Sequence, residues 1–233
     1  MKHIIIASTK GGVGKTTVAV NIARKLSTRY KVGILDGDLT SPSIYKILNA
    51  PVVKLKVGRD KIEPTTFANM KLFSTALLTG DDDMPILFKG EKKRSTIEQF
   101  INKINWGDLD YLIIDAAPGC SDELIELLEI FKNKIDGMVI VSTPSRLSVN
   151  SVRKLVTLCQ KKSVPIVGIV SNMAYFDCNV CHSHNLVFGN SYFIGQTVNE
   201  FDVDILCMLP ISMKVEDKPF SIIHNFNWVF EVL

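Results

Sequence analysis

The sequence lacks the features that mark a membrane-spanning or secreted protein. No apolar stretch reaches the length of about 20 residues that a membrane-spanning helix needs. Met1, Lys2 and His3 run straight into an apolar segment, so we expect no signal or transit peptide. The formal net charge is only +3, which requires neither nucleic acid nor an anionic membrane as a partner. We therefore expect a cytoplasmic protein that binds no nucleic acid and no membrane.

The chain is also poor in the features that divide a protein into parts or cross-link it. It has no internal repeat, no low-complexity tract and no linker, so residues 1–233 are expected to form a single domain. Five cysteines are an odd number, which argues against a disulfide framework. Cys120, Cys159 and Cys207 are scattered and are interpreted as small apolar fillers. The other two form a close pair with a different meaning.

Apolar segments alternate with amphipathic ones along the chain. Near-continuous apolar strands are typical of a parallel sheet that is covered on both faces. The amphipathic segments between them predict helices in right-handed crossovers. The predicted fold class is therefore α/β, with a doubly wound, mainly parallel sheet flanked by helices. The predicted strands cover residues 3–8, 32–35, 71–74, 111–114, 137–141, 165–170 and 205–208. The predicted helices cover residues 15–29, 94–105, 121–132, 146–162 and 191–201.

A glycine-rich turn follows the first predicted strand. Residues 10–17 read Lys-Gly-Gly-Val-Gly-Lys-Thr-Thr, and the glycines allow successive backbone N–H groups to converge on one point. The helix that begins near Gly14 adds its positive end to the same point. In such a phosphate-binding loop, Lys15 supplies a charge to the β- and γ-phosphates, and the Thr16 hydroxyl is a ligand for Mg²⁺.

The loop departs from the strict phosphate-loop pattern at its start. Thr9 stands where that pattern has a glycine, and Lys10 is an additional lysine inside the loop. A glycine-rich turn without a ligand is the alternative, and the preceding strand and the following Lys-Thr pair disfavour it. We interpret the segment as a variant P-loop within a P-loop NTPase fold.

Two further strand ends carry carboxylates. Asp115 ends an apolar strand, a position from which a carboxylate can hold Mg²⁺ through water. Asp36 and Asp38 end another strand, and a carboxylate there can orient the attacking water of a hydrolysis reaction. Taken alone, any one of these residues would be read as a helix cap or turn residue. Their order after a P-loop favours a nucleotide-hydrolysing site.

Cys178 and Cys181 are separated by two residues in a predicted loop. Two thiolates at this spacing can share one metal ion, but a tetrahedral site or a cubane cluster needs four ligands. The chain has no second pair of this kind, so the simplest completion is a two-fold dimer. Thiolates are the soft ligands that iron–sulfur clusters and Zn²⁺ prefer. A redox dithiol and an inert pair are the alternatives, and His182 and His184 are interpreted as surface loop residues.

The P-loop with its added Lys10 looks like the deviant Walker A motif of the MinD/ParA class of ATPases. Within that class, the chain resembles the Mrp/ApbC family of iron–sulfur carrier ATPases over residues 2 to about 190. The combination of matching motifs is specific, whereas no single motif outside the P-loop is. The matching stretches are Asp36-Gly37-Asp38 with Ser41-Pro42-Ser43, Pro85 to Gly90, Trp106 to Asp115, Pro118-Gly119 with Asp122-Glu123, Thr143-Pro144, Ser171 to Phe176, and Cys178 with Cys181.

The resemblance implies a role for each matching position. Lys10 would reach across a homodimer to the nucleotide of the partner subunit. Asp38 would help to position the catalytic water, and Asp115 would serve Mg²⁺ through its water shell. Asn172 would hydrogen-bond the adenine, with Pro210 in the adenine-side loop. The ATP phosphates would be bound by Gly11, Gly12, Val13, Gly14, Lys15, Thr16 and Thr17, with Thr16 on Mg²⁺.

The resemblance also implies a cargo. In this family the cysteine pair is taken to carry a labile [4Fe-4S] cluster that bridges two subunits, and the cluster is passed to apo iron–sulfur proteins. We expect the same of Cys178 and Cys181, in a metal-binding loop at about 173–190, with Zn²⁺ able to fill the site instead. Slow ATP hydrolysis is expected because no arginine finger is evident and Lys10 serves only once two subunits meet.

Two other functions stay open from the sequence. One is a positioning ATPase of the MinD/ParA kind on a membrane or DNA surface, although residues 221–233 contain no lysine or arginine. The other is a zinc-stabilised nucleotide-binding dimer with a vestigial site. It is motivated by Cys120 and Ser212, which replace a hydroxyl and an acidic residue of the family pattern. Residues 219–233 match nothing in the family and are expected to form a final helix or an apolar tail.

Overall fold

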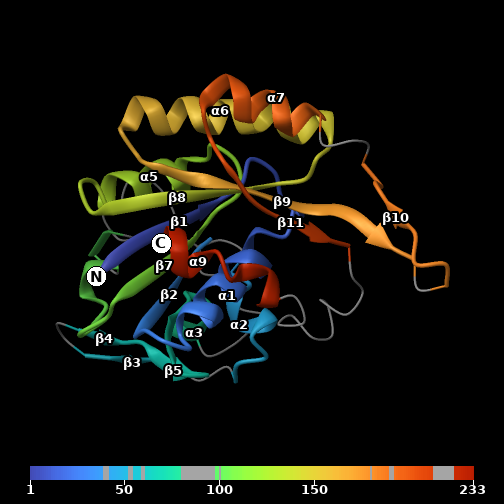
Figure 1. Cartoon of the computed structure of the whole chain (residues 1–233). Helices are drawn as coiled ribbons and strands as arrows, with labels where there is room; N and C mark the ends of the chain where they lie inside the picture. The colour runs from blue at the N-terminus through green and yellow to red at the C-terminus, as the bar shows by residue number, and fades with distance from the viewer. Residues whose placement is uncertain are drawn as a thin grey trace.

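The computed structural model describes residues 1–38, 42–51, 55–58, 61–79, 98–99, 101–178, 180–188, 192–211 and 223–233. A nine-stranded sheet runs through the molecule in the order β10-β9-β8-β1-β7-β2-β6-β5, with β11 pairing to β9 (Figure 1). Its strands are β1 (Lys2–Ala7), β2 (Val32–Gly37), β5 (Thr65–Phe67), β6 (Met70–Phe73), β7 (Tyr111–Ala116), β8 (Ile135–Ser142), β9 (Ile166–Asp177), β10 (His184–Asn185) and β11 (Ile205–Pro210). A separate two-stranded sheet pairs β3 (Lys56–Val57) with β4 (Ile62–Glu63).

The strands of the main sheet are mostly parallel. β1 lies between β7 and β8, and the pairs of β2 with β6 and β7, of β8 with β9 and of β9 with β11 are also parallel. Only the outer pairs β5–β6 and β9–β10 are antiparallel. Ile4, Ile5 and Ile6 of β1 are buried because both faces of the sheet are covered. The predicted doubly wound, mainly parallel α/β fold is confirmed.

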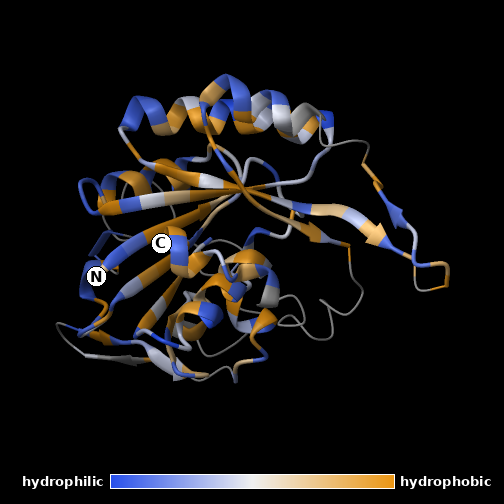
Figure 2. Ribbon diagram, viewed as in Figure 1, coloured by the Kyte–Doolittle hydropathy of each residue, from blue (hydrophilic) through white to orange (hydrophobic). Residues whose placement is uncertain are grey.

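Helices cover the two faces of the sheet. Figure 1 shows α6 and α7 side by side over one face, and α1, α2 and the C-terminal segment over the other. In Figure 2 the central strands are largely hydrophobic, whereas α6 alternates between hydrophobic and hydrophilic residues, as expected of a helix with one buried side. The helices are α1 (Lys15–Leu26), α2 (Ile44–Ile47), α3 (Ala76–Thr79), α5 (Asp122–Ile130), α6 (Arg146–Lys162), α7 (Tyr192–Phe201) and α9 (Val229–Val232), with a 3₁₀ turn, η1 (Ile223–Phe226).

The predicted boundaries hold best where a helix has a local capping signal. The hydroxyl of Ser145 accepts a hydrogen bond from the N–H of Ser148 and caps the start of α6. The helix ends at Lys162, and its C-cap residue, Ser163, has the left-handed conformation. The predicted helix 15–29 ends earlier, at Leu26, because the next residues form turns with carbonyls of the last helical turn. Within the predicted helix 94–105, the described residues 98–99 and 101–103 are helical, and Ile104 instead forms a bridge with Ile62.

Strand β9 is longer than the sequence predicts. The apolar run predicts a strand that ends by Asn172, but β9 continues to Asp177. The extension is stabilised by partners distant in sequence, because β10 pairs with Phe176 and Asp177, and Pro210 of β11 pairs with Tyr175. The extension projects beyond the sheet as an arm (Figure 1).

The C-terminal segment packs against α1. Phe226 and Val229 are fully buried, and the guanidinium carbon of Arg29 lies 4.0 Å from the centre of the Phe230 ring. The final helix expected from the sequence is therefore present as α9, and it contributes to the core. No helix among the described residues has the length and apolar character needed to cross a membrane.

Candidate nucleotide and metal sites

The phosphate loop connects β1 to α1. Gly12 and Gly14 have φ angles of 77° and 83°, in the region that favours glycine. Gly14 is the N-cap residue of α1 and has no side chain to accept from the first N–H groups of the helix. A 12-residue helix therefore begins with donors available to a ligand, and the positive end of its dipole lies beside them. This cradle suits the phosphates of a nucleotide.

Lys15 and Asp115 form a buried ion pair in this site. The Lys15 Nζ lies 2.5 Å from the Asp115 Oδ1, and both side chains are almost fully buried. The pairing follows from the register of the central strands, because Ile6 of β1 lies opposite Asp115 of β7. Burial raises the pKa of Asp115, and the charge of Lys15 opposes that increase. The carboxylate therefore holds the lysine at the base of the cradle.

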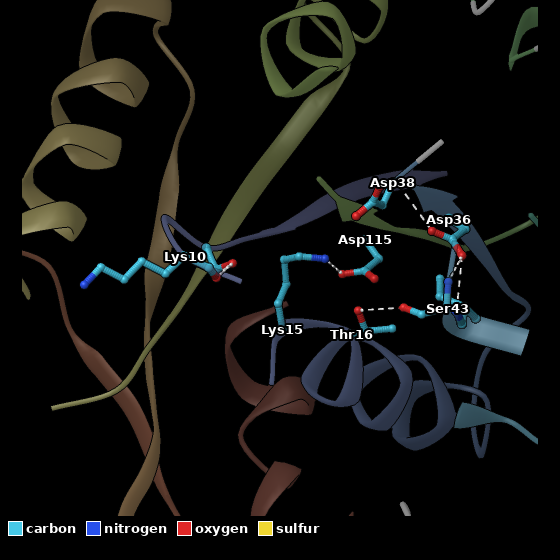
Figure 3. A network of polar contacts seen from close by, with 9 residues as sticks. Lys10, Lys15, Thr16, Asp36, Asp38, Ser43 and Asp115 are labelled. Atoms are coloured by element: carbon cyan, nitrogen blue, oxygen red, sulfur yellow. Dashed lines mark hydrogen bonds and ion pairs between the residues drawn. The ribbon is translucent and has the colours of Figure 1, made fainter. Parts of the chain in front are cut away.

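A second buried carboxylate, Asp36, anchors the end of β2 through hydrogen bonds to neighbouring residues (Figure 3). Its Oδ2 accepts hydrogen bonds from the N–H groups of Ser43 and Ile44, at 2.9 and 3.2 Å, and from the hydroxyl of Ser74 at 3.3 Å. Its Oδ1 accepts from the N–H of Asp38 at 3.3 Å. Burial raises the pKa of Asp36 to about 7, with a further contribution from the charge of Asp115. Asp36 therefore organises the end of β2, and the role of Asp38 toward the catalytic water stays a prediction.

Asp38 and Thr16 face the same space as the ion pair. Figure 3 shows the Asp38 carboxylate beside Asp115, and the Thr16 hydroxyl lies 3.4 Å from that of Ser43. Hydroxyl and carboxylate oxygens are the hard ligands that Mg²⁺ prefers, either directly or through its water shell. The residues present therefore fit a magnesium nucleotide, with Thr16 as a direct ligand and the carboxylates around it.

Lys10 does not point into the cradle that contains it. In Figure 3 its side chain extends away from Lys15 and Asp115, on the far side of the loop. Its ammonium group therefore cannot contact phosphates bound beside Lys15 in this arrangement. A lysine directed outward from a phosphate loop is available to a second molecule.

Asn172 contacts the phosphate loop directly. Its Nδ2 donates a hydrogen bond to the Val13 carbonyl at 2.8 Å, and the residue is buried. A Cβ at Gly14 would lie 2.2 Å from the same nitrogen, and the φ of 83° at this position also favours glycine. The role of Asn172 toward adenine stays a prediction, and so does that of Pro210, which ends β11. Ser212 lies outside the described residues.

Cys178 and Cys181 lie at the tip of the projecting arm formed by β9 and β10. The Cys178 N–H donates to the Ser183 carbonyl at 3.0 Å, and the His182 N–H donates to the Cys178 carbonyl at 2.9 Å. Cys178 is half-buried and Cys181 is exposed. Hydrogen bonds from Ser183 lower the pKa of the Cys181 thiol to about 7, which favours the thiolate that binds metals.

The arm supplies too few ligands for a complete metal site. Among the residues that the structure describes, no group of three or more His, Cys, Asp and Glu side chains is placed to hold a metal ion. His184 is engaged elsewhere, since its Nδ1 lies 2.9 Å from Asp177 and its ring centre lies 4.1 Å from that of Tyr175. Within the described part of the chain, the two thiols therefore lack the remaining ligands of a four-coordinate site.

Large apolar side chains surround the cysteines on the arm. Val180, between the two cysteines, is 90% exposed. The other exposed apolar side chains of the arm are Phe176, Leu186, Val187 and Phe188. An apolar group of this kind on a projecting hairpin is typical of a surface that another molecule covers.

The fold and the phosphate site together define a P-loop nucleoside triphosphatase of the MinD/ParA class. The chain belongs to the family described as "ParA: NUBPL iron-transfer P-loop NTPase", whose model matches residues 1–220. It is 40% identical over 196 residues to "Cytosolic Fe-S cluster assembly factor NUBP2 homolog" of Dictyostelium discoideum, covering 82% of this chain and 74% of that protein. It is 37% identical to the "Iron-sulfur cluster carrier protein" of Methanocaldococcus jannaschii, covering 93% of this chain and 75% of that protein.

Solved structures agree with this assignment. A nucleotide-binding protein of Archaeoglobus fulgidus, solved in complex with ADP, superposes with a TM-score of 0.79 at 30% identity, covering 99% of this chain and 90% of that one. MinD of Pyrococcus horikoshii superposes with a TM-score of 0.64 at 19% identity, covering 94% and 85%, and shares the fold. The predicted family is confirmed by the family model and by the relatives at 37–40% identity.

Proposed function

We propose that this protein is an ATP-binding, slowly ATP-hydrolysing carrier that assembles iron–sulfur clusters and transfers them to apo-proteins. One observation carries the proposal: a P-loop ATPase fold presents two thiols, Cys178 and Cys181, on an arm that projects from the end of the sheet. Relatives named as iron–sulfur cluster carriers and assembly factors support this reading. The name of one relative includes the word "cytosolic", which supports the cytoplasm as the location of this protein.

The carrier is proposed to act as a homodimer in which each subunit contributes Cys178 and Cys181. Four thiolates complete the ligand set of a [4Fe-4S] cluster, and the same four suit Zn²⁺. The exposed apolar side chains beside the cysteines support contact with a second copy at this place. Lys10, which points away from its own cradle, is proposed to reach the nucleotide of the partner subunit.

The ATP site is proposed to work by positioning and charge. The N-terminus of α1 and the loop amides bind the phosphates, and Lys15 leaves Asp115 to contact the β- and γ-phosphates. Thr16, and Asp115 through water, would hold Mg²⁺, which would supply positive charge to the phosphates. Asp38 orients the attacking water. Hydrolysis is slow because a single chain supplies no second cation to the γ-phosphate until the two subunits meet.

Reconstitution with iron and sulfide under anaerobic conditions tests the proposed cargo. The unaltered chain should bind four iron atoms per two subunits and sediment as a dimer. Cys178→Ser/Cys181→Ser should bind none, whereas Cys120→Ser/Cys207→Ser, with the same number of substitutions, should bind as much as the unaltered chain. A cluster content that does not depend on Cys178 and Cys181 would exclude the proposal. Stoichiometric zinc with no cluster would favour the zinc-stabilised dimer instead.

A further inference from the structure

One hydrogen bond joins the phosphate loop to the strand that bears the cysteines. Asn172 lies on β9 and donates from Nδ2 to the Val13 carbonyl at 2.8 Å. Cys178 directly follows the last residue of the same strand. The contact is tight, because Gly14 has no side chain and the Asn172 amide occupies the space that a Cβ would need. The phosphate site and the cysteine turn are therefore connected by one short segment of backbone.

The bonded carbonyl has a specific relation to the phosphates. The Val13 carbonyl and the Gly14 N–H belong to one planar peptide unit, so any rotation of the carbonyl turns the N–H as well. Loop N–H groups are the donors that bind phosphate. A phosphate that fixes the Gly14 N–H therefore also fixes the carbonyl to which Asn172 is bound, and it strengthens that hydrogen bond by polarising the peptide.

Strand β9 has an irregularity directly after Asn172. Met173 has a φ of 55°, a backbone conformation that residues other than glycine rarely adopt. Pairing with β11 changes register here, because Met208 lies opposite Ser171 while Pro210 lies opposite Tyr175. Pairing with β8 ends at Ser171. The strand thus has a half fixed in the main sheet and a half that belongs to the arm, and the Asn172 side chain is anchored at the junction.

We propose that Asn172 is a positioning residue that couples the occupancy of the phosphate loop to the arm bearing Cys178 and Cys181. With the loop filled, the Asn172–Val13 bond holds the junction in one arrangement and sets the orientation of the arm. With the loop empty, the bond is weaker and the arm samples other orientations. The purpose of this coupling rests on the proposed function, because it makes the orientation of the cluster ligands depend on nucleotide. Its physical basis does not depend on any cluster.

The test measures the thiols and not ATP turnover. Rates of alkylation by iodoacetamide are followed at Cys178 and Cys181 by peptide mass spectrometry in the metal-free chain. Each protein is measured without ligand, with Mg²⁺–ADP, and with Mg²⁺–tripolyphosphate, which fills the loop but has no adenine. Calorimetric titration of each variant sets the ligand concentration at saturation, so that loss of affinity is separated from loss of coupling. Cys159, which is fully buried, should stay unreactive in every folded variant.

Saturating Mg²⁺–ADP and Mg²⁺–tripolyphosphate should both change the two rates about fivefold or more in the unaltered chain, which is the lower end of typical coupling between sites. In Asn172→Ala, and in the isosteric Asn172→Asp, the rates at saturation should equal those without ligand. Asn199→Ala, an asparagine on the exposed side of α7, should respond as the unaltered chain does. Should Asn172→Ala expose Cys159, the Asn172→Asp variant decides.

Three outcomes would overturn the coupling: rates in the unaltered chain that ignore ligand, an undiminished response in both Asn172 variants, or a response to ADP but not to tripolyphosphate. The last would assign the effect to adenine and not to the phosphate loop. A chain that binds no cluster yet shows the expected alkylation pattern would reject the proposed carrier function while leaving this inference intact. A cluster-binding chain whose thiols ignore ligand would do the reverse.

Discussion

The Nζ of Lys15 lies 2.5 Å from the Oδ1 of Asp115, and both groups are buried at the end of the central strands. An ion pair in this environment is costly to break from one side, because the remaining charge has no water around it. The same lysine is the residue that the phosphate loop offers to a nucleotide. A binding event that draws Lys15 toward phosphate would remove the cation beside Asp115, and hydrated Mg²⁺ would supply another there.

Removing Lys15 should accordingly weaken both the site and the fold. Lys15→Met should abolish nucleotide binding and lower the free energy of unfolding by about 3 kcal/mol, because Asp115 is left buried and uncompensated. Lys15→Met/Asp115→Asn should recover most of that loss without recovering binding. Urea unfolding at pH 8 and calorimetric titration with ADP measure the two effects. A double variant no more stable than the single one would show that the pair contributes little to the fold.

Asp36 should make stability depend on pH. Burial and Asp115 raise its pKa from an ordinary value of 3.8 to about 7. Between these values the folded state binds a proton that the unfolded state does not, so this group's contribution to the free energy of unfolding decreases as pH rises, and it levels off above pH 7. Asp36→Asn removes this contribution. The free energy of unfolding of the unaltered chain minus that of the variant should therefore be about 2–3 kcal/mol larger at pH 5 than at pH 8.

The measurement is urea unfolding of both proteins at pH 5, 6, 7 and 8. Comparing the two proteins at each pH cancels the other titrating groups. A difference that stays constant across this range would place the pKa of Asp36 near its ordinary value. It would also imply that its four hydrogen-bond donors outweigh burial.

The Cys181 thiol should titrate near neutral pH because of Ser183. The Ser183 hydroxyl lies 3.1 Å from the sulfur, and hydrogen bonds from Ser183 lower the pKa of Cys181 to about 7. In the metal-free chain, the rate of alkylation of Cys181 should therefore reach half its maximum near pH 7. Ser183→Ala should move the midpoint toward the ordinary range of a free thiol. Ser151→Ala, on the exposed side of α6, is the matched control, and an unmoved midpoint in Ser183→Ala would contradict the assignment.

The apolar side chains of the arm should contribute to self-association. Leu186 and Val187 are 50% and 53% exposed, so each can bury roughly half its surface in a dimer. Leu186→Ser/Val187→Ser should weaken the reconstituted dimer by about 2–3 kcal/mol, or about 30- to 160-fold in dissociation constant. Sedimentation over a concentration series measures this. Leu147→Ser, at a 71% exposed position on α6, should leave the dimer unchanged, and equal effects of the two variants would argue against the arm as a contact.

The sequence predicts the parts of this site well and their connections poorly. The strand, glycine turn and helix of the phosphate loop are local features, and so is the serine cap of α6, so pattern and spacing are enough to place them. The hydrogen bond from Asn172 to Val13 joins residues far apart in the chain, so no local sequence pattern predicts it. The extension of β9 to Asp177 is not predicted for a related reason. After Val170 the run of branched apolar residues ends, and the segment continues as a strand because β10 and β11 supply hydrogen-bond partners.

Asp36 illustrates the same limit within a recognised motif. Two aspartates one residue apart at a strand end predict a site, but the sequence does not say which carboxylate is buried. Alternation along a strand would place both carboxylates on one face, but β2 ends at Gly37 and Asp38 lies beyond it. The Asp36 side chain accepts from the N–H groups of Ser43 and Ile44, whereas Asp38 lies beside Asp115. Burial, which distinguishes Asp36 from Asp38, is a property of the packed fold.

Lys10 provides the sharpest test of the proposed dimer, because a residue that acts in the neighbouring subunit can be complemented. Lys10→Ala should retain nucleotide affinity, since the side chain points away from its own cradle, and should lose most ATP turnover. Asp38→Asn should also lose turnover, in its own subunit.

In a mixed dimer, the site that keeps Asp38 receives Lys10 from the Asp38→Asn subunit and is complete. Mixing equal amounts before reconstitution should therefore restore about one quarter of the unaltered turnover, because random pairing makes half of the dimers mixed and each has one working site. Turnover is measured by phosphate release across mixing ratios, and either variant mixed with unaltered chain serves as the control. A mixture as inactive as its two components would mean that Lys10 and Asp38 act in the same subunit.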